Sequence, residues 1–381
     1  MLDSPAAIGL LTGLIASAFV ISRIVMAGRG DIAAFVLAGS AHVNAATTPR
    51  GLPVFPGQGY DGQFYYRLAL DPLDFARSAY GITLDTVSRL QRIGYPALSW
   101  LLALGKPSLV PASMVAVNLV ELALLGMCGA IFARDAGRHC AWGLLVPGYW
   151  GFVMSLSRDL TEITEALFVV VALLMLRRSR PLAAGIAFSA AVLSKEPAAL
   201  IVLAIGAVRI AGIPARPSGQ KVGRGDLAWA IPGSVFVSWQ LIVLHATGKI
   251  PALRDGHHNL GIPFVAMAQA IAHYVSHLPA TVSLLWCTEL AGLALVTVLA
   301  ARWWTRSSAP LGERVAWLLA GLLAVSLAQG IWMGAVDFRS LDDLYVLGIL
   351  VLLASPARLR LLGAAVPAVW LVAAVHLAVF L

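Results

Sequence analysis

Charged residues are scarce in this chain of 381 residues, because only 12% are Asp, Glu, Lys or Arg while 59% are hydrophobic. That composition excludes an ordinary soluble domain, in which about a quarter of the residues are charged. The 27 basic residues outnumber the 19 acidic ones, but they lie singly or in small clusters between apolar runs, as membrane-flanking charges do. We therefore expect a protein that contacts membrane lipids and binds no nucleic acid.

Cysteine is equally scarce, since Cys128, Cys140 and Cys287 are the only three. They lie in or beside apolar runs, at spacings unlike a disulfide framework or a zinc knuckle. The sequence also lacks a Walker loop, a dinucleotide-binding fingerprint and a recognisable Ser-His-Asp pattern. These absences disfavour nucleotide-dependent and serine-hydrolase chemistry, and we expect no required cofactor.

Apolar runs long enough to cross about 30 Å of hydrocarbon recur along the whole chain. The first, Ala6 to Gly28, exceeds a signal-peptide core and lacks a basic leader, so it should stay as an anchor. Arg23 near its end is interpreted as snorkelling to the interface, with a lipid phosphate contact as the alternative. Ten further runs lie at about 109–133, 141–157, 160–176, 181–194, 197–212, 227–247, 279–301, 311–334, 341–354 and 361–381. This pattern predicts an all-α polytopic membrane protein of about eleven transmembrane helices, forming one domain over residues 1–381.

The distribution of basic residues predicts the orientation of the chain. With a cytoplasmic amino terminus, the inner loops hold 14 Arg and Lys residues, whereas the short outer loops hold only Arg158, Lys195, Lys249, Arg254 and Arg339. Residues 29–108 then form a first extracytoplasmic loop, partly lying on the bilayer through amphipathic pieces at Ile32–Ala38 and Leu84–Ile93. Residues 248–278 form a second outer loop with an interfacial helix. We expect a multi-pass protein of the cell inner (plasma) membrane.

Polar residues are densest between Gly59 and Asp71-Pro72, in the first of these loops. Glycines on both sides of the Tyr60-Asp61 pair allow a substrate to approach the carboxylate closely. Four other polar clusters fall on the same predicted face: 157–162, 194–197, 254–258 and 337–343. A solvated rim explains any one of them, but five together favour a site, and we expect Lys195 and Arg339 to converge with the first loop around one cavity.

The first-loop motif resembles that of the GT-C superfamily of integral-membrane glycosyltransferases. The resemblance lies in Gly59-Tyr60-Asp61-Gly62-Gln63-Phe64-Tyr65-Tyr66, in Asp71-Pro72, and in Arg92-Ile93-Gly94-Tyr95-Pro96. It implies a GT-C-like bundle, a polyprenyl-phosphate-linked sugar as donor, and a glycan, lipid or protein acceptor. Gly62 follows the acid, so the paired acids of a DxD metal motif are missing, and we expect no metal bound there.

Inverting transfer from a lipid-phosphate sugar requires a base for the acceptor hydroxyl and cations for the departing phosphate. Asp61 is the candidate base, and burial under apolar helices is expected to raise its pKa; an N-cap of a helix beginning near Gln63 is the structural alternative. The candidate phosphate-binding residues share a positive charge and a predicted outer location: Arg67, Arg92, Arg158, Lys195, Arg339, His257 and His258.

The candidate sugar- or acceptor-binding residues are Tyr60, Gln63, Tyr65, Asp159 and Glu162. Asp159 and Glu162 share a face at a helix start, where capping suffices to explain Asp159. Glu162, one turn into the span, offers an oxygen ligand for acceptor hydroxyls or a divalent cation.

A second hypothesis is a transporter or flippase of a lipid-linked sugar. Glu121 and Glu289 fall near the middle of their predicted spans, where an acid is costly and often functional. Against it, the chain has no duplicated halves with matching broken helices, and the polar clusters gather on one face. A non-enzymatic assembly or binding subunit of the same fold is the third reading.

Overall fold

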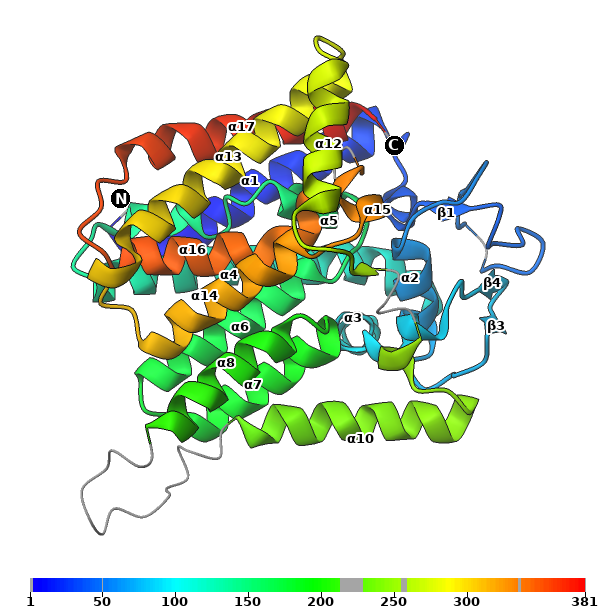
Figure 1. Cartoon of the computed structure of the whole chain (residues 1–381). Coiled ribbons are helices and arrows are strands. Elements are labelled where there is room, and N and C mark those ends of the chain that lie inside the picture. Colours follow the sequence, from blue (N-terminus) through cyan, green and yellow to red (C-terminus); the bar gives the residue numbers. More distant parts are fainter. Residues whose placement is uncertain (1–2, 50, 213–228, 255–258, 335–336, 381) are drawn as a thin grey trace.

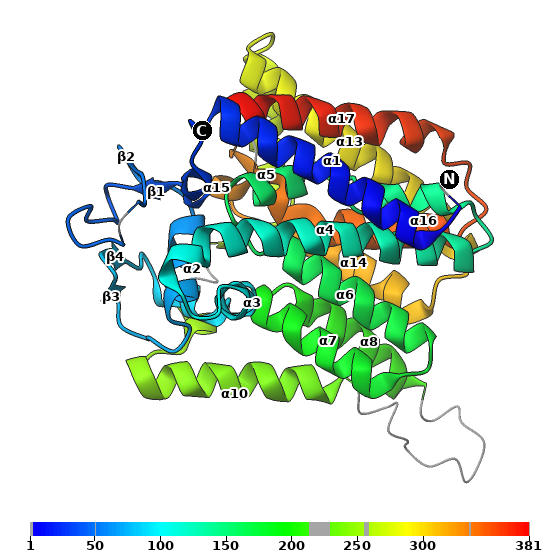
Figure 2. The ribbon, with the colours of Figure 1, turned by 180° about the vertical axis from the view of Figure 1, so that it is seen from behind.

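The computed structural model describes residues 3–49, 51–212, 229–254, 259–334 and 337–380, and nearly all regular structure in them is helical. The longer helices run side by side as one bundle (Figures 1 and 2). They are α1 (Pro5–Met26), α4 (Val110–Asp135), α6 (Glu162–Arg177), α7 (Pro181–Ser194), α8 (Ala198–Ala211), α10 (Ala230–Thr247), α13 (Thr281–Trp303), α14 (Leu311–Val325), α16 (Asp342–Leu353) and α17 (Arg360–Val379).

Within the described ranges, five helical segments are long and apolar enough to cross a membrane: Pro5–Met26, Pro107–Asp135, Ala230–Thr247, Thr281–Arg306 and Arg360–Val379. Two shorter apolar helices, α7 and α8, pack among them. The chain is thus an all-α membrane protein, while the count of about eleven spans stays a prediction.

Two predicted spans are not single helices. Residues 141–157 form η4 (Cys140–Leu145) and α5 (Gly151–Ser157), separated by a turn that contains Pro147 and Gly148. Proline has no N–H to continue a helix, and glycine costs conformational entropy in one. Residues 311–334 similarly divide into α14 and the short α15 (Gln329–Trp332).

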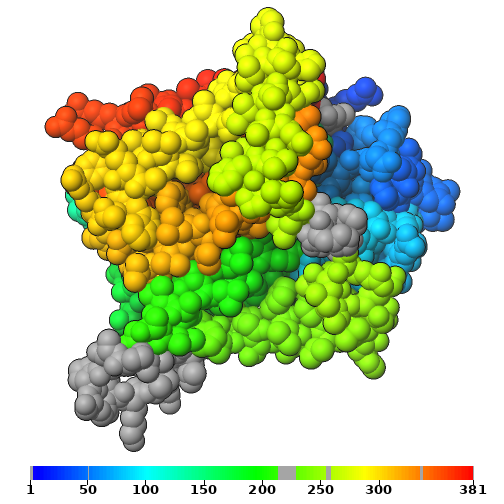
Figure 3. Space-filling model, in the orientation of Figure 1, coloured from blue at the N-terminus to red at the C-terminus, as the bar shows by residue number. Residues whose placement is uncertain are grey.

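The first-loop residues form one end of the molecule, shown in blue to cyan in Figures 1 and 3. Their helices are η1 (Ile32–Val36), α2 (Gly62–Leu70), η2 (Val87–Gln91), α3 (Gly94–Leu102) and η3 (Pro107–Leu109). Two minimal sheets join them: β1 (Ala38–Gly39) pairs in parallel with β2 (Val54–Phe55), and β3 (Ser78–Ala79) pairs antiparallel with β4 (Ile82–Thr83). Every residue of α2 is buried, so the motif lies inside the protein.

The second outer loop contains η5 (Pro251–Leu253) and α12 (Val265–Ser276). Just before α12, Leu260 forms an antiparallel bridge with Leu327 between α14 and α15. Two short elements remain in the described part of the chain. The helix η6 (Trp304–Arg306) follows α13, and η7 (Asp337–Leu341) leads directly into α16 and contacts α5. These contacts bring three segments that are distant in sequence to the end of the bundle that carries the first loop: the segment before α12, the segment between α14 and α15, and η7.

Arg23 does not snorkel. Its side chain is 1% exposed, and the guanidinium donates to the carbonyls of Ser157 at 3.0 Å, of Phe380 at 2.9 Å, and of Leu377. Both expectations for this residue, the interface and the lipid phosphate, are therefore wrong, because backbone carbonyls accept from Nε and Nη1 of the buried charge. The contact joins α1 to the end of α17.

Candidate active site

Two glycines place Asp61 at the beginning of α2. Gly59 has φ of +65°, and a Cβ atom there would lie 2.4 Å from the nitrogen of Gly39. A Cβ atom on Gly62 would lie 2.2 Å from the carbonyl oxygen of Arg158. Both contacts are too short for any side chain, so glycine lets the first loop lie directly against the turn between α5 and α6.

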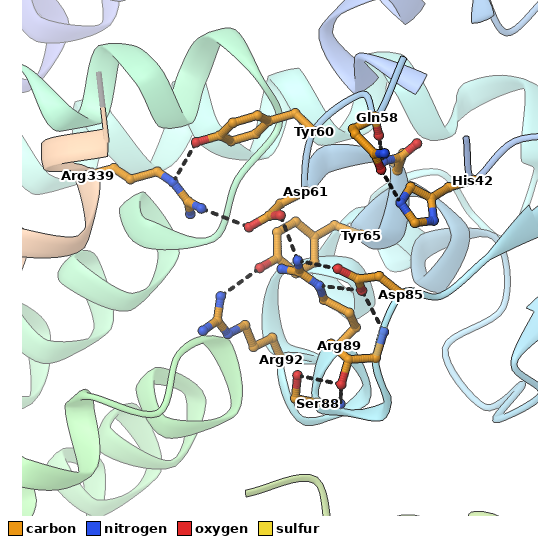
Figure 4. A network of polar contacts seen from close by, with 12 residues as sticks. His42, Gln58, Tyr60, Asp61, Tyr65, Asp85, Ser88, Arg89, Arg92 and Arg339 are labelled. Carbon is orange, nitrogen blue, oxygen red and sulfur yellow. Dashed lines mark hydrogen bonds and ion pairs between the residues drawn. The ribbon is translucent and has the colours of Figure 1, made fainter. Parts of the chain in front are cut away.

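The Asp61 carboxylate is held between two arginines (Figure 4). Its Oδ2 accepts from Arg339 at 2.8 Å, and its Oδ1 lies 2.8 Å from a guanidinium nitrogen of Arg89. Although Asp61 occupies the N-cap position of α2, its side chain makes no capping hydrogen bond. The capping alternative is therefore wrong, and the carboxylate belongs to an ion-pair network.

The expected rise in the pKa of Asp61 is also wrong. Burial alone would raise the pKa of the carboxyl, but the charges of Arg89 and Arg339 outweigh it and hold the pKa well below its usual range. Asp61 is consequently ionised at any physiological pH. It is a weak base for as long as both arginines remain on it.

Arg339 links Asp61 to the bundle. Its guanidinium donates to Asp61, to Glu162, and to the hydroxyl of Tyr60 at 3.2 Å. The same guanidinium lies 5.3 Å from the centre of the Tyr60 ring, over which Arg158 also sits at 4.7 Å. Residues almost 280 positions apart thus form one cluster, as the convergence of the polar loops predicted.

Arg92 lies on the other side of Asp61 and is paired with a different acid. Its Nε donates to both Glu196 oxygens at 3.1 and 3.0 Å, and another nitrogen donates to the Tyr65 hydroxyl at 3.1 Å. Burial lowers the pKa of Arg92, but Glu196 more than compensates and raises it well above its usual value. Tyr65 therefore positions an arginine through its hydroxyl.

Lys195, which directly precedes Glu196, is 3% exposed. Its Nζ lies 2.8 Å from Asp342 Oδ1, 3.4 Å from Glu165 Oε2 and 3.8 Å from Glu162 Oε1. Burial lowers the pKa of the ammonium, but these carboxylates reverse the effect and raise it above its usual value. Lys195 is thus a permanent cation between α6 and α16.

A cavity of about 680 Å³ adjoins these groups. Four basic side chains line it, and so do four acidic ones: Arg89, Arg92, Lys195 and Arg339 with Asp61, Asp85, Glu162 and Glu196. Another part of the wall is apolar and consists of Pro197, Leu200, Leu323, Leu327 and Ile331. The expected convergence of Lys195 and Arg339 with the first loop at one cavity is confirmed.

Six candidates are not part of the cavity lining: Tyr60, Gln63, Tyr65, Arg67, Arg158 and Asp159. Tyr60, Tyr65 and Arg158 contact members of the arginine cluster, whereas the other three have structural partners. Arg67 is 1% exposed and donates to the carbonyls of Asp74, at 3.1 Å, and of Ala76, so it orders the loop after α2 and is unsuited to bind donor phosphate. Gln63 accepts from the Gly39 N–H and donates to the Gln58 carbonyl, both at 2.9 Å.

Asp159 is the third of these residues. It is fully buried, has φ of +51°, and its Oδ1 lies 3.5 Å from the Tyr95 hydroxyl. The helix α6 begins only at Glu162, with Thr161 as its N-cap residue. The interpretation of Asp159 as a helix cap is therefore wrong, and it is not part of the cavity wall. His257 and His258 lie outside the described residues.

Several residues of the network were not predicted as site residues, namely Arg89, Asp85, Glu196, Glu165 and Asp342. Arg89 bonds Asp85 through Nε at 3.0 Å and through a terminal nitrogen at 2.9 Å, in addition to its contact with Asp61. The i, i+4 spacing of Asp85 and Arg89 is a signal for a pair that places the guanidinium. Glu165 lies one helical turn beyond Glu162, and this i, i+3 spacing indicates that both carboxyl groups lie on the same face of the helix.

No protein-family model matches this sequence, and no curated protein matches it. Among solved structures, the fold is similar to the crystal structure of the Archaeoglobus fulgidus oligosaccharyltransferase in the apo form, with a TM-score of 0.44 and 13% sequence identity. The similarity covers 96% of this chain and 56% of that protein. The chain therefore spans little more than half the length of the structure that it resembles.

Proposed function

We propose that the chain is a membrane glycosyltransferase that moves a hexosyl or pentosyl group from a polyprenyl-phosphate donor to a hydroxyl of a lipid, glycan or protein. The observation that carries this proposal is the Asp61 carboxylate, held by two arginines at a cavity with a second, apolar wall. A phosphate joined to a long apolar chain matches both parts of that cavity. The positive-inside pattern supports catalysis on the extracytoplasmic face.

Donor binding proceeds by exchange of ion-pair partners. Because the four basic and four acidic residues among the described part of the wall balance each other, an incoming phosphate has to compete with carboxylates for the guanidinium groups. Arginine suits this exchange, since its planar fork binds carboxylate and phosphate in the same bidentate geometry. The phosphate draws Arg89 and Arg339 away from Asp61.

This exchange makes Asp61 a stronger base when the donor is present. Once the arginines face phosphate, the positive charges that depress the pKa of Asp61 are neutralised, and the pKa rises toward its ordinary value. Asp61 then accepts the proton of the acceptor hydroxyl. The hydroxyl oxygen bonds to the anomeric carbon, the bond from that carbon to the phosphate oxygen breaks, and its electron pair leaves with the phosphate, inverting the configuration.

The test uses the full chain in lipid nanodiscs with a panel of radiolabelled polyprenyl-phosphate sugars. We expect transfer to an acceptor fraction, and its loss in Asp61→Asn protein that still binds donor. Liposomes that contain the protein test the alternative: movement of the lipid-linked sugar across the bilayer without transfer would refute the enzyme and support a flippase.

A further inference from the structure

Three carboxylates meet behind the wall that carries Asp61. Glu165 projects from the first turn of α6, and Asp342 and Asp343 are the first two residues of α16. One oxygen of each lies within 4.8 Å of the others. Glu165 is fully buried, and Asp342 and Asp343 are 1% and 8% exposed, so water does not solvate the group.

The charges at this point are not balanced. Lys195 contacts Asp342 at 2.8 Å and Glu165 at 3.4 Å. The other nearby cation, Arg339, pairs with Glu162 and Asp61. Among the described residues, three carboxyl groups thus share one ammonium, so full ionisation would leave two negative charges unbalanced in a site with little access to water. Isolated buried carboxylates are costly and are normally paired or bound to a metal.

Glu165 provides a second and independent indication. Apart from the 3.4 Å ion pair of its Oε2 with Lys195 and a contact with the Asp343 carboxyl, neither of its oxygens accepts a hydrogen bond from an N–H or hydroxyl donor among the described residues, and Asp342 Oδ2 accepts none either. Both side chains are at least nine-tenths buried and belong to the cluster. Donors of the protein thus leave several carboxyl oxygens of this cluster without a hydrogen bond, and one oxygen of each member lies within 4.8 Å of the others, where a cation could bind them.

We propose that Glu165, Asp342 and Asp343 form a site for a hard divalent cation of the Mg²⁺, Mn²⁺ or Ca²⁺ class. Such ions prefer oxygen ligands at about 2.0 to 2.6 Å, so two ligands of one ion lie at most about 4 to 5 Å apart, as these oxygens do. The two positive charges of such a cation would neutralise the negative charge that the fully ionised carboxylates hold in excess of Lys195. The first turns of α6 and α16 place both helix N-termini at this point, which helps to keep the carboxylates ionised.

The site is separate from the first-loop motif and does not depend on the proposed glycosyl transfer. None of its three ligands lines the cavity, whereas Lys195 borders both the cavity and the cluster. Binding of a cation weakens the hold of Asp342 on Lys195, and the ammonium gains freedom toward the cavity.

The experiment measures Mn²⁺ binding to the purified full-length protein by the loss of the free-ion electron paramagnetic resonance signal at pH 7. We expect one saturable site per chain, which Mg²⁺ displaces. Glu165→Gln and Asp343→Asn keep the volume of each side chain and should weaken Mn²⁺ at least tenfold. The matched control is Asp135→Asn, at a partly exposed carboxylate paired with Arg178 at 2.7 Å, which should bind Mn²⁺ like the wild type.

A second readout is the thermal unfolding midpoint, which Mn²⁺ should raise in the wild type and not in either cluster variant. If one variant fails to fold by size-exclusion chromatography, the other decides. Absence of saturable Mn²⁺ binding in the wild type, as expected if the carboxylates hold protons, would overturn the proposal. Unchanged binding in a folded cluster variant would also overturn it.

Discussion

Replacing Asp61 with asparagine separates donor binding from catalysis. The substitution removes the charge and retains one acceptor oxygen. Arg89 keeps its two bonds to Asp85 at 2.9 and 3.0 Å, and Arg339 keeps Glu162. Neither guanidinium is left without an anion, so we expect the variant to fold with a loss of about 1 to 3 kcal/mol, the scale of a hydrogen bond to a charged group.

Donor binding should become tighter in this variant. Two unit charges 4 Å apart interact by about 4 kcal/mol at an effective dielectric constant of 20. In the variant, the repulsion between the Asp61 charge and the donor phosphate is lost. The remaining carboxylates and water cancel most of this gain in binding free energy, and we expect about 1 kcal/mol, or a roughly fivefold lower dissociation constant. Turnover should fall by about 10² to 10⁴, as is typical for a lost acid or base.

The assay compares equilibrium binding of a labelled donor lipid with single-turnover transfer, in the wild type and in Asp61→Asn. Asp31→Asn is the matched control, because Asp31 caps η1 through a 2.8 Å bond to Ala33 and asparagine caps equally well. Near-normal transfer by Asp61→Asn would refute the catalytic role. Weaker donor binding would refute the exchange of arginine partners.

The pH dependence of stability gives an independent check on the same ion pairs. The pKa of Asp61 is depressed in the folded protein, so its contribution is complete above the unfolded value of about 3.9 and disappears as the pH falls through the folded value. The difference in unfolding midpoint between wild type and Asp61→Asn should be constant from pH 6 to 8 and shrink below about pH 4. A difference that persists unchanged at pH 3 would contradict the assignment.

Three further experiments test the geometry of the site and the orientation of the chain. Gly62→Ala places a Cβ atom 2.2 Å from a carbonyl oxygen, so we expect a loss of about 1 to 3 kcal/mol in thermal unfolding and at least tenfold lower transfer; an unchanged midpoint would refute the close approach. Leu327→Trp fills the apolar wall and should weaken donor binding more than tenfold, whereas Leu322→Trp, at a 58% exposed position of α14, should not. In a cysteine-free background, Gln58→Cys should react with an impermeant maleimide in intact cells and Ser179→Cys should not, and the reverse pattern would invert the predicted orientation.

Much of the helical arrangement follows from hydrophobic length alone. The predicted run 181–194 coincides with α7, and the runs at 109–133, 197–212 and 279–301 agree with α4, α8 and α13 to within a few residues at each end. The run 141–157 failed because hydropathy sums over a turn that Pro147 and Gly148 make locally. Hydropathy measures the free energy of transferring side chains between the bilayer and water. It does not predict where the backbone hydrogen bonds of a helix end.

The sequence predicted the site only where the uneven distribution of basic residues between loops assigned polar clusters to the same side of the membrane. Sorting the loops by side correctly grouped Lys195 and Arg339 with Asp61. Arg67 failed because it lies six residues after Asp61, which is about 600° of helical rotation at 100° per residue, so it faces elsewhere. Arg89 was missed because its stretch looked like an amphipathic piece on the bilayer, whereas a folded loop turns its guanidinium inward to Asp61.

The buried guanidinium of Arg23 sets a constraint on how the chain is made. Arg23 lies in α1, yet two of its three carbonyl partners, those of Leu377 and Phe380, lie 354 and 357 residues further along the chain and are synthesised much later. Until α17 is synthesised, this charge lacks two of its three carbonyl ligands, and the contact between the two helices forms only when α17 packs beside α1. A variant truncated before residue 377 therefore keeps an arginine in α1 that lacks two of its three carbonyl ligands, a costly arrangement for a charge in a membrane protein.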